Sequence, residues 1–219
     1  DVYKRQIYEC VEGIFERLHE MIPFDESLMA FYEEPELLEE FFQKMADYKI
    51  ETTKNVFQYY GRVDGVLYHD DWGTQRSGFF SNEMFREQLM PATTRYLKFV
   101  KDQGKFIELH SCGKNVQYVP EMLEMGIDMW TPQAVINDPD FLYETYGDKM
   151  SFAFFLNIDH DDEQEIRKKI RDFVEHFGAK GRCMPWIMTD MSNPTQEVIA
   201  RDELYHYSLE YYNKLYQRG

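Results

Sequence analysis

Residues 106–133 read FIELHSCGKNVQYVPEMLEMGIDMWTPQ, and this stretch indicates the fold. Two short apolar runs, Phe106–Leu109 and Ile127–Trp130, flank a longer stretch in which polar and apolar residues mix. Runs that are continuously apolar, rather than alternating, are typical of strands buried on both faces, as in parallel sheets. The stretch therefore predicts a strand–helix–strand unit whose two strands are parallel.

The same unit recurs on both sides of this stretch. Further apolar runs lie at Val63–Tyr68, Phe152–Ile158 and Cys183–Met188, separated by amphipathic stretches. Strands that alternate with helices indicate the α/β class. About five parallel strands are visible, whereas a TIM-type barrel needs eight. The sheet is therefore predicted to be open, or to be part of an (α/β)8 barrel whose remaining strands lie upstream.

The N-terminal third has a different pattern. Residues 7–60 are predicted to be a helical segment, with the clearest helix beginning at Pro35 and ending at Gly61. Residues 1–6, DVYKRQ, resemble a translated sequencing adapter, so we expect an artefact there and a single domain over residues 7–219. Pro91 interrupts a helical stretch and predicts a kink near residues 87–90.

Composition excludes several classes of function. The chain has 24 Lys and Arg against 40 Asp and Glu, a formal net charge of −16, which disfavours binding to nucleic acid or to an anionic membrane surface. No apolar run approaches the roughly 20 residues that span a bilayer. Three cysteines form no paired framework, and no signal peptide is recognisable, so a cytoplasmic location is expected.

His110 and Cys112 are the strongest candidates for metal ligands. Both follow the apolar run that begins at Phe106, and positions i and i+2 of a strand point to the same side. Imidazole and thiolate are good zinc ligands, and zinc needs at least one more from the protein. Cys183 opens its strand, whereas Asp190 follows the same strand and is better placed as that third ligand. The alternative is a polar strand end with a buried cysteine.

Carboxylates and amides at other strand ends are candidates for substrate binding or catalysis. Asp70 and Asp71 are adjacent, so only one can enter a barrel lumen; the other role open to them is capping the next turn. Asp159 could bind substrate, orient His110, or cap the following helix. Substrate contacts are expected from Asp71, from Gln75 and Arg76 in the loop after Asp71, and from Gln133 after the next strand, while Arg76 could instead neutralise its acidic neighbours.

Four motifs, in this order, resemble the uroporphyrinogen decarboxylase superfamily. They are Asp70-Asp71-Trp72-Gly73-Thr74-Gln75-Arg76, Ser81-x-Glu83-Met84-Phe85-Arg86, Leu109-His110-Ser111-Cys112-Gly113 and Pro120-x-x-Leu123-x-x-Gly126-x-Asp128. The closer resemblance is to the corrinoid-dependent methyltransferase branch. It implies an (α/β)8 barrel of which this chain is the C-terminal two-thirds.

The resemblance also implies a function. In the methyltransferase branch a His-x-Cys and a later cysteine bind zinc, and a substrate thiolate on the zinc takes a methyl group from a corrinoid (cobalamin) on a partner protein. His110 and Cys112 match the first two ligands, but near Thr189 and Asp190, where the later one falls, this chain has no Cys or His. In the decarboxylase branch an aspartate at the position of Asp70 holds the pyrrole nitrogens. A metal-free tetrapyrrole decarboxylase and an inactive, binding-only fragment are therefore the alternatives.

Overall fold

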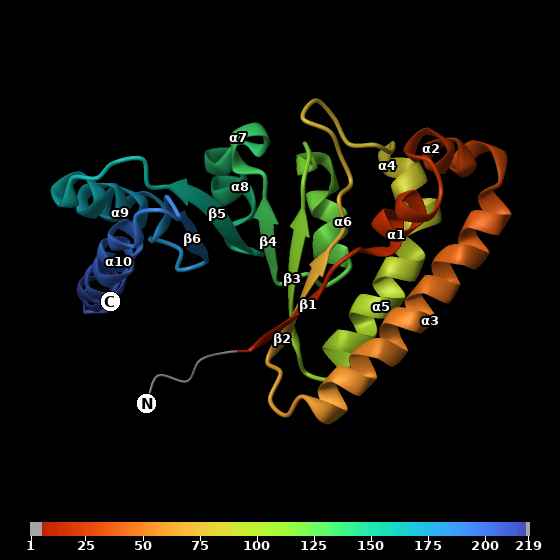
Figure 1. Ribbon diagram of the computed structural model, residues 1–219, viewed down its shortest axis with the longest axis horizontal. Coiled ribbons are helices and arrows are strands. Elements are labelled where there is room, and N and C mark those ends of the chain that lie inside the picture. Colours follow the sequence, from red (N-terminus) through yellow and green to blue (C-terminus); the bar gives the residue numbers. More distant parts are fainter. Residues whose placement is uncertain (1–5, 218–219) are drawn as a thin grey trace. The chain divides into compact units, whose positions relative to one another are not determined.

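The computed structural model describes residues 6–217, which form two compact units that divide between Asn137 and Asp138 (Figure 1). The predicted artefact at residues 1–6 lies, except for Gln6, outside the described residues. The backbone N–H of Gln6 donates to the carboxylate of Asp64, and the backbone N–H of Asp64 donates to the carbonyl of Gln6. The single domain over residues 7–219 stays a prediction.

The first unit contains four parallel strands whose order in space follows the chain. They are β1 (Ile7–Cys10), β2 (Gly65–His69), β3 (Phe106–Ser111) and β4 (Met129–Pro132). Three of them match predicted strands. The prediction that residues 7–60 are all helical is wrong for β1, which has only four residues and includes the polar Glu9, too short a run to show a strand pattern.

Helices connect successive strands of the first unit. The segment between β1 and β2 forms α1 (Ile14–Met21), α2 (Phe24–Glu33) and α3 (Pro35–Tyr59). The remaining helices are α4 (Asn82–Met84), the π-helix η1 (Phe85–Leu89), α5 (Met90–Asp102), the 3-10 turn η2 (Val116–Tyr118), α6 (Val119–Glu124) and α7 (Ala134–Asn137). In Figure 1, α3 and α5 run side by side along one face of the strands, as in a barrel wall.

A π-helix precedes Pro91, at the place where the sequence predicted a kink. Proline has no N–H and its ring crowds the preceding turn, so a regular α-helix cannot run through residues 87–90. The chain instead forms the π-helix η1, and the N–H of Met90 bonds to the carbonyl of Phe85 five residues earlier. The predicted helix start at Pro35 is also confirmed by α3.

Aromatic side chains fill the core of the first unit. The Phe15 ring meets Phe80 edge to face at 4.9 Å between centroids, and Phe80 lies 4.6 Å from Phe31. Farther along the same layer, Phe85 packs against Trp72 at 4.9 Å and stacks on Tyr118 at 4.6 Å. Rings of this size bury large apolar areas and add favourable edge-to-face contacts. Part of the aromatic content of the chain is thus accounted for by this core.

The second unit pairs two parallel strands with helices. It consists of α8 (Pro139–Tyr146), β5 (Ser151–Asn157), α9 (Glu163–Phe177), β6 (Cys183–Met188) and α10 (Pro194–Tyr216). Ile158, Ile166, Ile170 and Ala200 form a core cluster between these elements. Both predicted strands are confirmed, and α8 and α10 each begin with a proline, Pro139 and Pro194. Asp138 caps α8, whereas the side chain of Asn193 bonds to Asp161 and does not cap α10.

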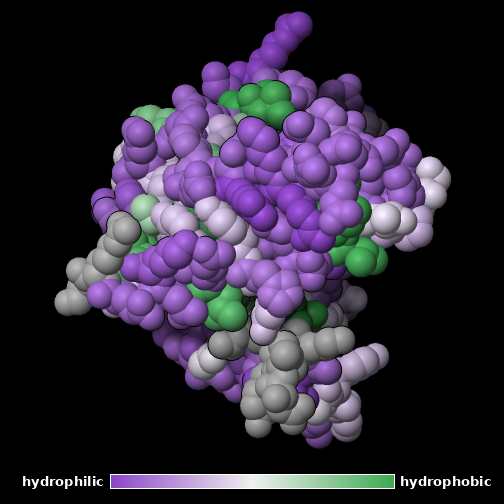
Figure 2. All heavy atoms as spheres, turned by 90° about the vertical axis from the view of Figure 1, so that its left-hand side faces the viewer, coloured by the Kyte–Doolittle hydropathy of each residue, from purple (hydrophilic) through white to green (hydrophobic). Residues whose placement is uncertain are grey.

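The molecular surface reflects the charge of the chain. The face in Figure 2 is mostly hydrophilic, with a few separate apolar patches. Among residues 6–217, no helix combines the length and the apolar character needed to cross a membrane.

Candidate functional site

The register of β2 and β3 brings two histidines together. The last residue of β2, His69, lies opposite His110 in the parallel ladder. Residues opposite each other on neighbouring strands point to the same face of the sheet. Their rings stack with centroids 4.7 Å apart and planes inclined by 27°. No role was predicted for His69. Its position beside His110 follows from the register of β2 against β3, which cannot be inferred from the sequence.

Asp71 and Cys112 extend this cluster by two residues along each strand end. Cys112 Sγ lies 3.3 Å from Nε2 of His110, so the predicted convergence of the two side chains is observed. Oδ1 of Asp71 accepts a hydrogen bond of 2.6 Å from the backbone N–H of Cys112. All four side chains are half-buried.

The donor atoms are spaced as a metal ion requires. One ligand atom from each of His69, Asp71 and His110 lies within 4.8 Å of the other two. Zinc–nitrogen and zinc–sulfur bonds at a tetrahedral angle place the two ligand atoms about 3.6 Å apart, close to the distance between His110 and Cys112. Nitrogen, sulfur and carboxylate oxygen all suit zinc. His69, Asp71 and His110 therefore fit a cation of this class, whereas Cys112 lies beside His110 and is not part of that group of three.

Glu16, from α1, completes the surroundings of the histidines. Nδ1 of His69 lies 2.8 Å from the Glu16 carboxylate. Histidines that bind metals generally donate their other ring nitrogen to such a partner, which fixes the tautomer and the ring orientation. The bond to Glu16 raises the pKa of His69, whereas burial and the adjacent His69 lower the pKa of His110. The lowered pKa of His110 favours the neutral imidazole, the form that can act as a metal ligand.

The thiol of Cys112 is held in its protonated form by its surroundings. Burial, and then the charge of Asp71, raise its pKa to about 11. No hydrogen bond or ion pair within residues 6–217 joins a Lys or Arg to Glu16, Asp70 or Asp71. A site with carboxylates and no basic side chain favours a cation, and a bound cation lowers the pKa of a thiol ligand.

Asp70 lies on the opposite face of β2, in the helix-covered layer. Its buried carboxylate accepts hydrogen bonds from the backbone N–H groups of Phe15 and Glu16 at 3.3 and 2.9 Å, and from the hydroxyl of Tyr68 at 3.0 Å. Burial and the neighbouring Glu16 raise its pKa to about 6. Asp70 thus anchors the N-terminus of α1, the helix that carries Glu16. Its catalytic role stays a prediction.

Two buried asparagines hold the loop after β3. Asn115 donates to Oγ of Ser111 at 2.9 Å and to the carbonyl of Cys112 at 2.6 Å. Asn137 accepts from the backbone of Asn115 at 2.8 Å and donates to the carbonyl of Gly113 at 2.8 Å. Neither asparagine was predicted to have a role. The position of Asn115, three residues after the candidate ligand Cys112, could have indicated a residue that supports the site. They fix the backbone that carries Cys112.

The predicted substrate-binding residues lie around this cluster. Nε2 of Gln75 donates to Oε1 of Gln133 at 2.9 Å, and the same oxygen accepts from the N–H of Gly113 at 3.3 Å. Gln75 and Gln133 are therefore brought together beside the loop of Cys112. Arg76 is exposed, and its side chain forms no ion pair within the described residues. Their substrate contacts remain predictions.

The remaining candidates belong to the second unit. Asp159 is exposed and forms an ion pair with Lys169, which lowers its pKa. Asp162, not Asp159, caps α9 by accepting from the N–H groups of Gln164 and Glu165. Cys183 lies at the start of β6, where burial raises its pKa to about 12, and Asp190 accepts from Ser192. In the first unit, Asp71 and His69 lie beside His110 and offer further ligand atoms, while the predicted roles of Asp159, Cys183 and Asp190 stay predictions.

Comparison with solved structures identifies the architecture. A methyltransferase from Methanosarcina mazei superposes with a TM-score of 0.68 at 18% identity, over 92% of this chain and 59% of that chain. The DHPS of Yersinia pestis matches with a TM-score of 0.46 at 12% identity, over 94% of this chain and 71% of that one. The chain thus spans less than two thirds of the methyltransferase's length. No curated protein sequence matches it.

Parallel strands in chain order, helices between them and polar clusters at the strand ends define an enzyme-like α/β protein. The likeness to the methyltransferase confirms the prediction of a partial TIM-type barrel. The family model for uroporphyrinogen decarboxylase (URO-D) matches residues 10–150. The chain belongs to this family, as its motifs predicted.

Proposed function

We propose that this protein is a zinc-dependent enzyme of the methyltransferase branch, which transfers a methyl group between a corrinoid on a partner protein and a small-molecule thiol. The observation that supports this most directly is the half-buried cluster of His110, Cys112, Asp71 and His69 at neighbouring strand ends. The methyltransferase fold of the M. mazei structure is a second, weaker support.

The proposal assigns the metal to the first unit. His110, Cys112 and Asp71 would hold zinc, and His69, oriented by Glu16, would provide a fourth donor that a substrate can displace. Zinc bound there would lower the pKa of a substrate thiol, so that a thiolate is present at neutral pH. The cluster itself excludes Lys and Arg, so its carboxylates remain available to the cation rather than to an ion pair.

The chain's own residues would prepare the site in three ways. Asp70 anchors α1 and thereby positions Glu16 against His69. Asn115 and Asn137 fix the backbone of Cys112 and Gly113. Gln75 and Gln133, with Arg76 nearby in the same loop, would bind the polar end of the methyl acceptor, and an acidic acceptor would pair with the guanidinium of Arg76.

A paired binding and turnover experiment tests the proposed function. The protein, loaded with zinc, is incubated with methylcobalamin and a thiol, and loss of the methyl–cobalt absorption is followed for the wild type, Cys112→Ser and Asp70→Asn. We expect demethylation by the wild type and at least about a hundredfold loss in Cys112→Ser. Demethylation that persists unchanged in Cys112→Ser contradicts the proposal.

The decarboxylase alternative predicts a different dependence. A porphyrinogen-like tetrapyrrole would bind the wild type and Cys112→Ser equally, and would lose affinity only in Asp70→Asn. That result, with no demethylation by the zinc-loaded wild type, would favour the decarboxylase branch. Asp70 is buried under α1, so we expect no tetrapyrrole binding that depends on it.

A further inference from the structure

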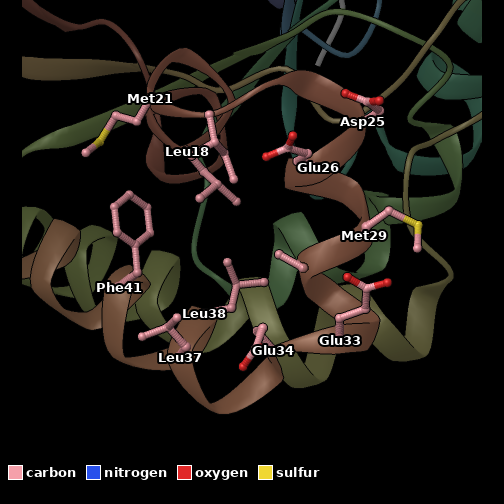
Figure 3. Close-up of a pocket in the computed structure, with 12 residues that line it drawn as sticks. Leu18, Met21, Asp25, Glu26, Met29, Glu33, Glu34, Leu37, Leu38 and Phe41 are labelled. Atoms are coloured by element: carbon pink, nitrogen blue, oxygen red, sulfur yellow. The ribbon is translucent and has the colours of Figure 1, made fainter.

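An open apolar groove lies between α1, α2 and α3, away from the strand-end cluster (Figure 3). Its volume is about 640 Å³, within the range of ligand-binding clefts. Leu18 and Leu38 are buried at its floor, while Met21, Met29 and Leu37 are exposed by 63%, 49% and 62%. In Figure 3 Leu18 and Leu38 point into the space between the helices, whereas Met21, Met29 and Leu37 lie along its margin and point outward. Apolar side chains this exposed on three adjacent helices indicate a binding surface.

Four carboxylates surround this apolar floor. Asp25, Glu26, Glu33 and Glu34 all line the groove, and all are exposed. Within residues 6–217, none of them takes part in an ion pair. The sequence from Leu18 to Gln43 contains eight Asp and Glu residues and no Lys or Arg. We call this surface, the twelve residues of the groove, the acidic groove.

The apolar floor and the acidic rim together determine which kind of ligand the groove can bind. An apolar floor needs apolar anchors, and an unpaired acidic rim needs cations beside those anchors. A helix with Leu, Ile or Phe on one face and Lys or Arg flanking that face supplies both. Methionine side chains adapt their shape to such anchors, and two of them lie in the groove. A second copy of this chain is disfavoured because both copies carry a formal charge of −16.

We propose that the acidic groove binds a basic, amphipathic helix of a partner protein. The site does not require a metal at the strand ends and is separate from the proposed methyl transfer. An anionic membrane surface, the other common target of apolar and charged patches, is repelled by the same carboxylates that attract the helix.

A synthetic peptide tests the proposal. The probe is a fluorescently labelled helix of about 18 residues, built from leucine and lysine at helical spacing, and a matched peptide has glutamate in place of each lysine. Binding to the full chain is measured by anisotropy. We expect the lysine peptide to bind and the glutamate peptide to bind at least about tenfold more weakly, because it meets the rim with like charge.

Matched variants separate the groove from general attraction to an acidic protein. The rim variant carries Asp25→Asn, Glu26→Gln, Glu33→Gln and Glu34→Gln. The floor variant carries Met29→Ser and Leu37→Ser. The control variant removes four exposed carboxylates outside the groove, by Glu83→Gln, Glu87→Gln, Glu144→Gln and Glu165→Gln. All substitutions are at exposed residues, so each protein should fold, which circular dichroism checks. We expect the dissociation constant to rise about tenfold in the rim and floor variants and less than about threefold in the control.

Three results would overturn the proposal. They are absence of binding to the wild type, equal weakening by the rim and control variants, and binding that survives in the floor variant. Dimerisation in analytical ultracentrifugation that the floor variant abolishes would assign the groove to a second copy. Binding to anionic vesicles that the floor variant abolishes would assign it to a lipid surface.

Discussion

At the scale of single residues, only two of the four residues in the strand-end cluster of His69, Asp71, His110 and Cys112 could be predicted as metal ligands from the sequence. His110 and Cys112 stand two apart on one strand, and that spacing alone predicts that they converge. Asp71 was predicted to bind substrate, and no role was predicted for His69. Their contacts with His110 and Cys112 depend on the register of β2 against β3, which cannot be inferred from the sequence. Because side chains alternate along a strand, Asp70 and Asp71 are predicted to point to opposite faces of the sheet, but the alternation does not show which of them faces the site.

The first prediction concerns the reactivity of Cys112. Because Asp71 contributes to the raised pKa of its thiol, Asp71→Asn should lower that pKa and accelerate alkylation by iodoacetamide at pH 8 about threefold or more. Mass spectrometry of the alkylated peptides measures the rate in metal-free protein. Cys183, whose pKa is raised by burial alone, is the internal control and should react at an unchanged rate. Equal acceleration of both cysteines would contradict the assigned cause.

The second prediction concerns the pH dependence of stability at Asp70. Its pKa is raised from 3.8 to about 6 in the folded protein, so folding favours its protonated form. The stability that this group contributes is therefore fully present below pH 4 and is lost as the pH rises through 6. The loss is on the order of 3 kcal/mol for a shift of about two units.

Asp70→Asn removes this dependence and keeps an acceptor for the N–H groups of α1. Its free energy of unfolding, relative to that of the wild type, should therefore improve from pH 4 to pH 7. Urea unfolding at several pH values measures the difference. A difference that stays constant, or that falls with pH, would contradict the burial of an ionisable carboxyl at this position.

At the scale of secondary-structure elements, strands and proline-initiated helices could be predicted, whereas the connections could not. Three of the four strands of the first unit, and both strands of the second, follow from continuous apolar runs. β1 was missed because a strand of four residues gains its stability from pairing with β2 rather than from its own pattern. The sequence predicted a kink before Pro91, whereas the structure has a π-helix there.

The third prediction concerns the loop between β3 and η2. Gly113 has a φ of +96°, and a Cβ there would overlap the backbone of Gly73 in the loop that follows β2. Gly113→Ala should therefore destabilise the protein by at least about 2 kcal/mol. Gly104→Ala is the matched control, because Gly104 also has a positive φ, of +67°, but faces open space. It should cost about 1 kcal/mol. Equal losses in thermal unfolding would show that the two loops do not touch.

The fourth prediction concerns Asn137, at the end of α7. Removal of its side chain in Asn137→Ala leaves the backbone N–H groups of Asn115 and Val116, and the carbonyl of Gly113, without a partner. We expect a loss of about 2–4 kcal/mol in stability, together with at least about tenfold weaker zinc binding. Isothermal titration in protein that is still folded separates the two effects. Unchanged zinc affinity would limit Asn137 to a structural role.

At the scale of the whole molecule, composition indicated an acidic chain, the alternation of strands with helices indicated the α/β class, and the structure confirms that fold class. The family also followed from the sequence, because two of its four motifs follow β2 and β3 directly, at the strand ends where the active site of a barrel lies. The acidic groove could not be predicted from the sequence, since it depends on how three helices pack.

The fifth prediction follows from the net charge of −16. Repulsion among excess carboxylates destabilises the compact state, and salt screens it. Raising sodium chloride from about 0.02 M to about 0.3 M should therefore increase the melting temperature by a few degrees. Differential scanning fluorimetry at neutral pH measures this, and tetramethylammonium chloride should act equally. A melting temperature that falls with salt would mean that the ion pairs of the surface outweigh the repulsion.

The most direct test of the account is the zinc stoichiometry of the purified chain. Elemental analysis is made on the wild type, on Cys112→Ala and Asp71→Ala, and on Cys183→Ala and Asp190→Ala as matched controls from the second unit. The account predicts about one zinc per chain in the wild type and in both controls, and at least about tenfold weaker retention in Cys112→Ala and Asp71→Ala. Absence of zinc from folded wild-type protein, or retention that depends on Cys183 or Asp190 and not on Asp71, would contradict it.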